Sequence, residues 1–465
     1  MIPAGAPIVT AEEMRAAEEE AFRHVTQHDL MERAGAAVAR EAARFALGRP
    51  VLVLAGPGNN GGDAYVVARL LKAAGLDVAV AALGEPKAGA ARAMWERWDG
   101  VTTSLYEAKA RSFVVDGLFG TGMTRAMERG PRALMADLVK AAAFSLAIDL
   151  PSGLDTDTGA DFGAPCVTVT VALGALKPAH VLDAGLEKCG HVLLADIGVA
   201  VPPGWHSVAR PLLSAPGPYD HKYSRGMVAV IEGAMPGAAR LAAGAAMAGG
   251  AGYVTLAGAE PQSRIDALVR RTISGADELA DLLKDERIGA VVIGPGLGRE
   301  RRAEGLLKAA LASPHPLVLD GDALSLLGKN AARWLQARRG SAWLTPHSGE
   351  FDRMFGEGPG SKIDRTLAAA AETGATIVHK GGDTVIAAPQ GEVRVLADGS
   401  PWLSTAGTGD ILAGLLAARA ATGQKGLAAA EAAAWLHARA ARLAGPAFIA
   451  DALIGHIPEA IAECL

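Results

Sequence analysis

Short apolar runs recur along the chain, and a glycine-rich or polar loop and then a helical pattern follow most of them. The clearest run is Val51–Ala55, which is typical of a parallel strand buried on both faces. Such runs with helices between them predict an α/β protein built on a doubly wound parallel sheet. The expected strands are residues 51–55, 77–83, 112–116, 144–149, 167–171 and 191–195, then 227–232, 252–256, 290–293, 317–320, 342–345 and 376–379.

A proline-rich stretch divides the chain. Residues 201–219 hold five prolines and no apolar periodicity, which predicts a linker. A chain of 465 residues is also long for a single hydrophobic core. We therefore expect one domain at residues 1–210 and a second at residues 211–465. Their motifs differ, which indicates a fusion and not a duplication.

Composition excludes several classes of protein. A net charge of −5 gives no basic surface for nucleic acid or an anionic membrane. No signal peptide and no apolar run long enough to span a bilayer is visible, so we expect a cytoplasmic protein. Cys166, Cys189 and Cys464 lack metal-type spacing and cannot form a disulfide framework, so we expect them to be reduced.

The loop after the first expected strand reads G-P-G-N-N-G-G-D, residues 56–63. It contains G-x-G-x-x-G between a strand and a helix, the context of dinucleotide binding. Asn59 and Asn60 add two amides, whose oxygens can ligate a hard cation and whose nitrogens can hold phosphate. An asparagine-rich turn is the simpler alternative, plausible for one asparagine and less so for the whole octapeptide.

Two further strands of the first half end in carboxylates. Asp116 precedes G-L-F-G-T-G, and Asp149 precedes L-P-S-G-L-D. Ligands of open α/β sheets bind at the carboxyl ends of strands, so these carboxylates are expected to converge with Asn60 and Ser152. Taken singly, each aspartate would more often be a helix cap or a solvated loop residue.

The second half contains the stretch T-A-G-T-G-D-I-L-A-G, Thr405–Gly414. Small residues precede an apolar helix pattern, so free N–H groups at the helix start could hold an anion. Asp410 would stand beside that anion as a base. The alternative is an ordinary turn with an aspartate as N-cap. No G-x-x-x-x-G-K-[ST] occurs, which excludes a P-loop.

Three other loops of the second half could complete a phosphoryl-transfer site. They are G-P-G-L-G at residues 294–298, T-P-H-S-G-E at 345–350 and K-G-G-D-T at 380–384. Such a site needs a phosphate cradle, a cation and a base near the acceptor. By themselves, His347 would more often be a loop histidine and Lys380 a solvated hairpin charge.

The motifs N-N-G-G-D, V-D-G-L-F-G-T-G and D-L-P-S-G-L-D, in this order, resemble the epimerase half of the NAD(P)H-hydrate repair enzymes. The order G-P-G-L-G, T-P-H-S-G-E, K-G-G-D-T and A-G-T-G-D resembles their dehydratase half. The resemblance covers most of the chain and implies a Rossmann-like domain fused to a ribokinase-like domain. It also implies that the R and S epimers of hydrated NADH and NADPH (NADHX and NADPHX) are interconverted, and that the S epimer is dehydrated at the expense of ADP or ATP.

In the first half, the resemblance implies a potassium ion bound by Asn60, Asp116 and Ser152, with Asp149 handling a proton. It implies contacts with the hydrated dinucleotide by Asn59, Asn60, Gly61, Gly62, Asp63, Gly120, Thr121, Gly122, Met123, Thr124, Arg125, Ala126 and Asp149. The family usually continues N-N-G-G-D-G, whereas this chain has Ala64.

In the second half, the resemblance implies magnesium, ADP or ATP, and Asp410 as the base at the hydrate hydroxyl. The implied hydrate contacts are Ala239, Gly296, His347 and Asp410, and the implied nucleotide contacts are Lys380, Gly381, Gly382, Asp383, Thr384 and Gly409. Ser348 stands where the family more often has proline, and E-G-A-M-P-G replaces a smaller serine–glycine loop. We expect a homo-oligomer that binds neither nucleic acid nor membrane.

Three other functions compete with this one. A vitamin-precursor or sugar kinase would use G-T-G-D equally well. A nicotinamide-dependent oxidoreductase would explain the first glycine loop. Residues 1–210 could also be only a nucleotide-binding or partner-binding module.

Overall fold

The computed structural model describes residues 2–123, 125–262 and 265–465. It divides into two compact units, Met1–Ser207 and Val208–Leu465, where we expected the boundary between residues 210 and 211. Within the described ranges, no helix has both the length and the apolar character needed to cross a bilayer. The three cysteines are free thiols, as expected.

The first unit is built on a parallel sheet with the strand order β3-β2-β1-β4-β5-β6-β7. The predicted doubly wound sheet is thus confirmed, and the strand order reverses between β1 and β4. Only β3 was not predicted, because T-T-S has no apolar run. The strands are β1 (Val51–Ala55), β2 (Val78–Ala82), β3 (Thr102–Ser104), β4 (Phe113–Gly117), β5 (Phe144–Ile148), β6 (Val169–Leu173) and β7 (His191–Ala195).

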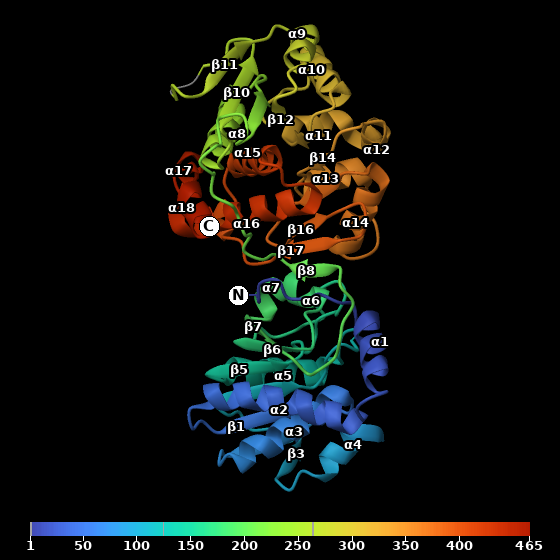
Figure 1. Cartoon of the computed structure of the whole chain (residues 1–465). Coiled ribbons are helices and arrows are strands. Elements are labelled where there is room, and N and C mark those ends of the chain that lie inside the picture. The colour runs from blue at the N-terminus through green and yellow to red at the C-terminus, as the bar shows by residue number, and fades with distance from the viewer. Residues whose placement is uncertain (1, 124, 263–264) are drawn as a thin grey trace. The chain divides into compact units, whose positions relative to one another are not determined.

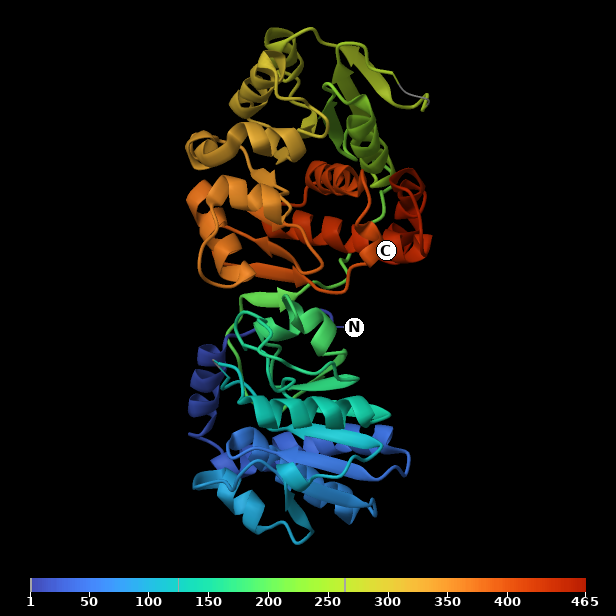
Figure 2. The same cartoon turned by 180° about the vertical axis from the view of Figure 1, so that it is seen from behind.

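Helices cover both faces of this sheet. Figure 1 shows the face under α2, and Figure 2 shows the opposite face under α5. Val53 of β1 packs in the core with α2 and α3, whereas Leu52 and Leu54 pack in the core with α5. The helices are α1 (Ala11–Ala21), α2 (Gln27–Ala46), α3 (Asn59–Ala73), α4 (Gly89–Glu96), η1 (Leu105–Glu107), α5 (Arg129–Ala141), α6 (Pro178–Val181) and α7 (Gly185–Lys188).

The predicted linker is wrong in one part. Trp205–Ser207 forms the strand β8, and His206 makes an antiparallel bridge with Pro7 near the amino terminus. Ser207 Oγ also accepts a hydrogen bond from the backbone of Ala6 at 2.9 Å. The segment is ordered by a partner some 200 residues away in sequence, which local proline content cannot reveal.

The strands of the second unit follow the order β11-β10-β9-β12-β13-β14-β15-β16-β17. Neighbours from β11 to β15 are parallel, and β16 and β17 add antiparallel strands. The six predicted strands are present, whereas β11, β16 and β17 were not predicted. The strands are β9 (Met227–Ile231), β10 (Tyr253–Gly258), β11 (Val269–Thr272), β12 (Ile288–Ile293), β13 (Leu317–Leu319), β14 (Ala342–Leu344), β15 (Thr376–His379), β16 (Thr384–Ala387) and β17 (Val393–Leu396).

Helices rich in small residues form the core beside this sheet. A Cβ atom on Gly414 would lie 2.1 Å from the carbonyl oxygen of Ala242, so α15 and α8 pack backbone to backbone. The helices are α8 (Pro236–Ala248), α9 (Ala276–Leu282), α10 (Arg301–Ala312), α11 (Gly321–Leu327), η2 (Gly328–Asn330), α12 (Ala331–Gln336), α13 (Ser348–Phe355), α14 (Lys362–Thr373), η3 (Pro401–Leu403), α15 (Thr408–Ala421), α16 (Gly426–Ala444), α17 (Ala450–Ile454) and α18 (Ile457–Ala462).

Candidate active sites

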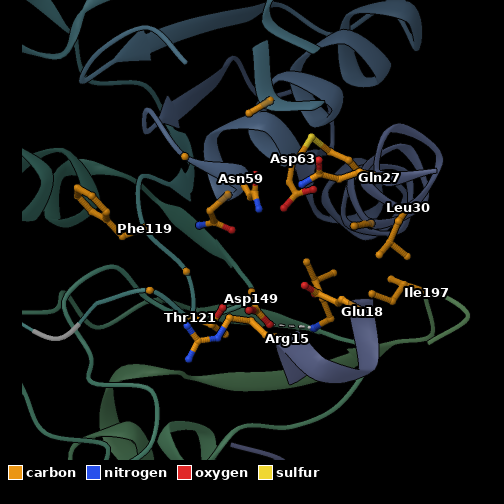
Figure 3. Close-up of a pocket in the computed structure, with 18 of the residues that line it drawn as sticks. Arg15, Glu18, Gln27, Leu30, Asn59, Asp63, Phe119, Thr121, Asp149 and Ile197 are labelled. Atoms are coloured by element: carbon orange, nitrogen blue, oxygen red, sulfur yellow. Dashed lines mark hydrogen bonds between the residues drawn. The ribbon is translucent and has the colours of Figure 1, made fainter. Parts of the chain in front are cut away.

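The first unit contains a cavity of about 750 Å³ whose lining includes the loops after β1, β4 and β5 (Figure 3). We call it the first-unit cavity. It therefore lies at the carboxyl end of the sheet, where the strand order reverses. Seven residues implied by the resemblance line it, namely Asn59, Asn60, Asp63, Gly120, Thr121, Gly122 and Asp149.

Close backbone packing shapes the G-P-G-N-N-G-G-D loop. A Cβ atom on Gly56 would lie 1.8 Å from the carbonyl oxygen of Leu118, and one on Gly61 would lie 1.8 Å from that of Gly56. Only glycine fits at either position. Asn59 begins α3, and the N-cap Gly58 supplies no side-chain hydrogen bond. The free N–H groups of this first turn are suited to an anionic ligand.

Asp149 forms a buried ion pair that the sequence did not reveal. Lys177 Nζ donates to Asp149 Oδ1 at 2.5 Å and to the carbonyl oxygen of Leu173 at 2.8 Å. Both charged residues are buried and line the first-unit cavity. The available sequence signal was a lysine directly after an apolar run, in G-A-L-K-P.

The backbone of Asp149 is in the left-handed region, with φ of 63°. Its carbonyl oxygen lies 2.6 Å from His180 Nε2. Burial lowers the pKa of His180 to about 4, and the charge of Lys177 adds to this effect. A neutral imidazole therefore holds a conformation that a non-glycine residue adopts only at a cost.

Asp63 is buried in the wall of the first-unit cavity, with 8% of its surface exposed. Its carboxyl group makes no hydrogen bond or ion pair with any residue in the described ranges. Burial raises the pKa of Asp63 well above its ordinary value, and the carboxylates of Asp149 and Glu18 raise it further. Burial likewise raises the pKa of Glu18, a cavity residue that the sequence did not indicate. Asp63 therefore favours its protonated form.

Other residues implied for the first unit lie outside this lining. Gly61, Gly62 and Met123 are buried, while Arg125 and Ala126 are exposed. Thr124 lies outside the described residues. Ala64 is fully buried, and a Cβ atom on Gly117 of β4 would lie 2.6 Å from its methyl group. The alanine therefore faces the sheet, so it does not narrow the approach to the loop.

In the second unit, the G-T-G-D stretch forms the start of α15. Gly407 is the N-cap with φ of 93°, and a Cβ atom there would lie 2.6 Å from Leu241 and 2.9 Å from Ala450. Asp410 is the third residue of the helix, so the alternative of an aspartate N-cap is wrong. No side chain caps the helix, which leaves its first N–H groups available to an anion.

Two charged side chains lie beside this helix start. Lys380 Nζ donates to Asp320 Oδ1 at 2.9 Å, and Thr345 Oγ1 donates to the same oxygen at 2.7 Å. A Cβ atom built on Gly409 would lie 3.2 Å from Lys380 Nζ and 3.8 Å from Asp320 Oδ2. Asp320 was not predicted as a site residue, although its place at the end of an apolar run was a signal.

The charges around Asp410 set its protonation. Burial and the charge of Asp320 together raise the pKa of Asp410 to about 6, although the charge of Lys380 opposes this shift. Burial of Lys380 works to lower its own pKa, but the adjacent Asp320 leaves that pKa raised. Asp410 is thus poised to act as a base near neutral pH, next to a fixed positive charge.

The remaining second-unit residues have varied surroundings. His347 is exposed and caps α13 in a capping box with Glu350. Gly296 has φ of 58°, and its carbonyl oxygen accepts from Met235 N at 2.9 Å. Ala239 is fully buried in the core, so its side chain offers no surface to a ligand.

The K-G-G-D-T loop begins at Lys380 and leads into β16. Gly381 and Gly382 are exposed, whereas Asp383 is ion-paired with Lys362 at 2.5 Å. Thr384 Oγ1 donates to the carbonyl oxygen of Gly381 at 2.9 Å, which closes the turn. The loop therefore exposes the backbone of its two glycines, while the carboxylate of Asp383 is held in the ion pair with Lys362.

Comparison with known proteins identifies the family. Residues 27–179 match a family model described as YjeF-related protein N-terminus, and residues 228–462 match one described as NAD(P)H-hydrate dehydratase. A bifunctional NAD(P)H-hydrate repair enzyme (Nnr) of Mycobacterium leprae is 33% identical over 89% of both chains. This chain belongs to the bifunctional NAD(P)H-hydrate repair enzymes.

Other members of this family are similar over comparable lengths. The enzyme of Moorella thermoacetica is 35% identical, over 88% of this chain and 87% of its own. That of Gloeobacter violaceus is 36% identical over 88% of both chains. The structure of an ADP/ATP-dependent NAD(P)H-hydrate dehydratase from Bacillus subtilis, co-crystallised with ATP/Mg²⁺, is 27% identical and covers 55% of this chain and 95% of its own, with a TM-score of 0.49. Family membership confirms the predicted Rossmann-like and ribokinase-like fusion.

The three residues for which the sequence resemblance implied a potassium ion fit a hard monovalent cation. Asp116 is fully buried and has no ion-pair partner among the described residues. Ser152 donates to it from Oγ at 2.7 Å and from the backbone at 2.8 Å, and Phe119 O lies 3.1 Å from the same hydroxyl. Asn60 Nδ2 is buried without a partner, and rotation of the amide would put its oxygen there. The donor set is rich in oxygen, as such a cation requires.

The second site fits magnesium in the way that nucleotide enzymes hold it. The described residues include no cluster of three or more histidine, cysteine or acidic side chains that could form an all-protein metal site. Magnesium is usually held by one or two carboxylates together with substrate phosphates. Asp320, beside the start of α15, would supply such a carboxylate, which leaves Asp410 as the base.

Proposed function

We propose that the first unit interconverts the R and S epimers of hydrated NADH and NADPH, and that the second unit dehydrates the S epimer with ADP or ATP. The observation that carries this proposal is Asp410, a base at an uncapped helix start beside the Lys380–Asp320 pair. The helix start alone would suit the hydroxyl of any kinase substrate. Family membership indicates that the hydroxyl from which Asp410 takes a proton is that of a nicotinamide hydrate.

Dehydration begins with a poor leaving group. Asp410 takes the proton from the hydrate hydroxyl, whose oxygen then attacks the terminal phosphate of the nucleotide. The N–H groups at the start of α15 and the ammonium of Lys380 stabilise charge on the transferred phosphoryl group. Bound magnesium supplies further neutralisation of phosphate charge. The phosphate then leaves with the C–O bonding electron pair, and loss of a proton from the adjacent ring carbon to solvent forms the C=C bond and restores NADH or NADPH.

Epimerisation is proposed to proceed by loss and re-addition of water at the same carbon. Asp149 donates or accepts the proton of that water. Its ion pair with Lys177, with 2.5 Å between Nζ and Oδ1, fixes the orientation of its carboxylate. The backbone N–H groups at the start of α3 and the Gly120–Gly122 loop would hold the dinucleotide, and bound potassium would order the Asn60, Asp116 and Ser152 region.

A single assay separates this function from its rivals. The purified chain is given the S hydrate of NADH, ADP and magnesium, while phosphate and absorbance at the NADH band are measured. We expect one phosphate for each NADH restored. A kinase would instead accumulate a phosphorylated product without free phosphate, and an oxidoreductase would act without a nucleoside diphosphate or triphosphate. Either result would refute the dehydratase assignment.

A further inference from the structure

We propose that Asp63 is a second catalytic residue of the epimerase, exchanging a proton on the face of the nicotinamide ring opposite to Asp149. The inference rests on the proposed epimerase function and deepens it. It assigns to Asp63 a chemical role beyond contact with the dinucleotide.

The chemistry requires two proton-exchanging groups. The R and S hydrates carry their hydroxyl on opposite faces of one ring carbon. When water leaves from one face and adds from the other, the departing oxygen needs a proton donor and the arriving water needs a proton acceptor. A single carboxyl group on one wall of a cavity cannot reach both faces unless the ring turns over. An epimerase that keeps its substrate seated therefore needs an acid–base group on each wall.

The first-unit cavity has such a pair. Asp63 projects from α3 and Asp149 follows β5, and Figure 3 shows them on opposite sides of the cavity, with Glu18 to one side. Asp149 Oδ1 is occupied by Lys177 at 2.5 Å and by Leu173 N at 3.1 Å. Asp63 has no such partners in the described ranges. Its carboxyl group is therefore available to a ligand, which a purely structural buried acid would not be.

The charges around the cavity keep a proton on Asp63. Burial raises its pKa, and Asp149 and Glu18 face it with negative charge. Lys177 is engaged by Asp149, and no cation within the described part of the chain forms an ion pair with Asp63. The other charged or titratable groups of the cavity and its walls are Arg15, Glu19, Lys87 and the buried His180 behind Asp149. Asp63 thus favours its protonated form, whereas Asp149 is held in an ion pair with Lys177, and such a difference in surroundings is typical of acid–base partners.

The proposed steps balance without an oxidant or reductant. Asp63 donates its proton to the hydroxyl of the R hydrate, the C–O bond breaks, and water leaves with the bonding electron pair. The ring nitrogen shares the resulting positive charge as an iminium. A water molecule on the opposite face then forms a C–O bond as Asp149 accepts its proton, which yields the S hydrate. The reverse reaction, or proton exchange with solvent through the cavity, restores the initial state.

The test compares Asp63→Asn with the wild-type chain and with Asp137→Asn, an exposed carboxylate on α5. Each full-length protein receives purified R hydrate in ¹⁸O-labelled water without nucleotide. Chromatography follows S-hydrate formation, and mass spectrometry follows incorporation of the label. We expect Asp63→Asn to lose epimerisation and label incorporation together by roughly 100-fold or more. Asp137→Asn should match the wild type. In a separate assay with ADP and magnesium, dehydration of the S hydrate by the second unit checks that each variant protein is folded and active.

The outcomes separate this inference from the function beneath it. If the wild-type chain does not exchange epimers, the epimerase function is refuted and this inference falls with it. If the wild type exchanges epimers and Asp63→Asn does so within about threefold, only the role of Asp63 is refuted. Should Asp63→Asn fail to bind hydrate, the pH profile of the wild type decides. The rate must fall as pH rises through the raised pKa of Asp63, and a rate that stays flat or rises would overturn the proposal.

Discussion

Lys380 Nζ lies 2.9 Å from Asp320 Oδ1, and the pair stands at the start of α15 beside Asp410. This relationship places one cation between two carboxylates and an uncapped helix start. The helix start can therefore do more than bind an anion. Asp320 raises the pKa of Asp410, while Lys380 remains positively charged. A base and a phosphate-binding cation therefore coexist at one site.

The dehydratase should lose activity in acid because its base becomes protonated. Burial and Asp320 raise the pKa of Asp410 to about 6, and only the ionised form accepts the proton. We predict that kcat/KM for the S hydrate falls as pH drops through about 6. Asp320→Asn should move this limb to lower pH, since it removes the charge that raises the pKa. The exposed Asp281→Asn is the control, and an unmoved limb in Asp320→Asn would refute the coupling.

Lys177→Met should strongly destabilise the first unit. It leaves Asp149 buried without its cation, which typically costs about 3–5 kcal/mol. Denaturant unfolding measures this loss, with the exposed Lys140→Met as the control. The double variant Lys177→Met/Asp149→Asn should recover part of it. A loss below about 1 kcal/mol in the single variant would show that the ion pair is not buried as described.

Gly61→Ala should perturb the N-N-G-G-D loop, because its Cβ atom would lie 1.8 Å from the carbonyl oxygen of Gly56. We expect a loss of about 1–3 kcal/mol in unfolding free energy and a weaker affinity for the hydrate. Gly58→Ala is the matched comparison for stability, since nothing lies within 4 Å of its Cβ position. Equal unfolding free energies for the two variants would contradict this account of the loop.

Ala64→Gly tests whether the chain's departure from N-N-G-G-D-G affects catalysis. Ala64 lies in α3 with its methyl group buried toward β4. The glycine should therefore cost about 1–2 kcal/mol through helix propensity and the lost methyl group, with no gain in epimerisation. Calorimetry and the R-to-S exchange assay check both expectations. A faster exchange in Ala64→Gly would mean that the methyl group does obstruct the substrate.

The sequence predicted the strands whose signal is local. Val51–Ala55 is an unbroken apolar run, and His191–Ala195 is apolar after its first residue. The bounds of both match the strands β1 and β7. By contrast, β11 reads V-R-R-T and lies at one end of the second sheet, so it lacks the apolar run of a buried strand. Pairing with a distant neighbour orders such strands, and a short window of sequence carries no record of that neighbour.

In the candidate sites, too, the residues with a local sequence signal could be predicted and those placed by distant contacts could not. Asp116, Asp149 and Asp410 were recognisable because each stands in a glycine-rich loop after an apolar run or at a helix start. The partner of Asp149 was not recognisable, since Lys177 is 28 residues away, and neither was Asp320, which pairs with Lys380 across 60 residues. The raised pKa of Asp63 was equally hidden, because it depends on burial and on carboxylates that the fold brings together.

The most direct test of the whole account uses mixed R and S hydrates of NADPH with ADP and magnesium. Recovery of absorbance at the NADPH band is followed for the wild type, Asp149→Ala and Asp410→Asn. We predict full conversion by the wild type, rapid conversion of only the S portion by Asp149→Ala, and none by Asp410→Asn. Wild-type rates in Asp410→Asn, or rapid conversion of both epimers by Asp149→Ala, would contradict the division of labour between the two units.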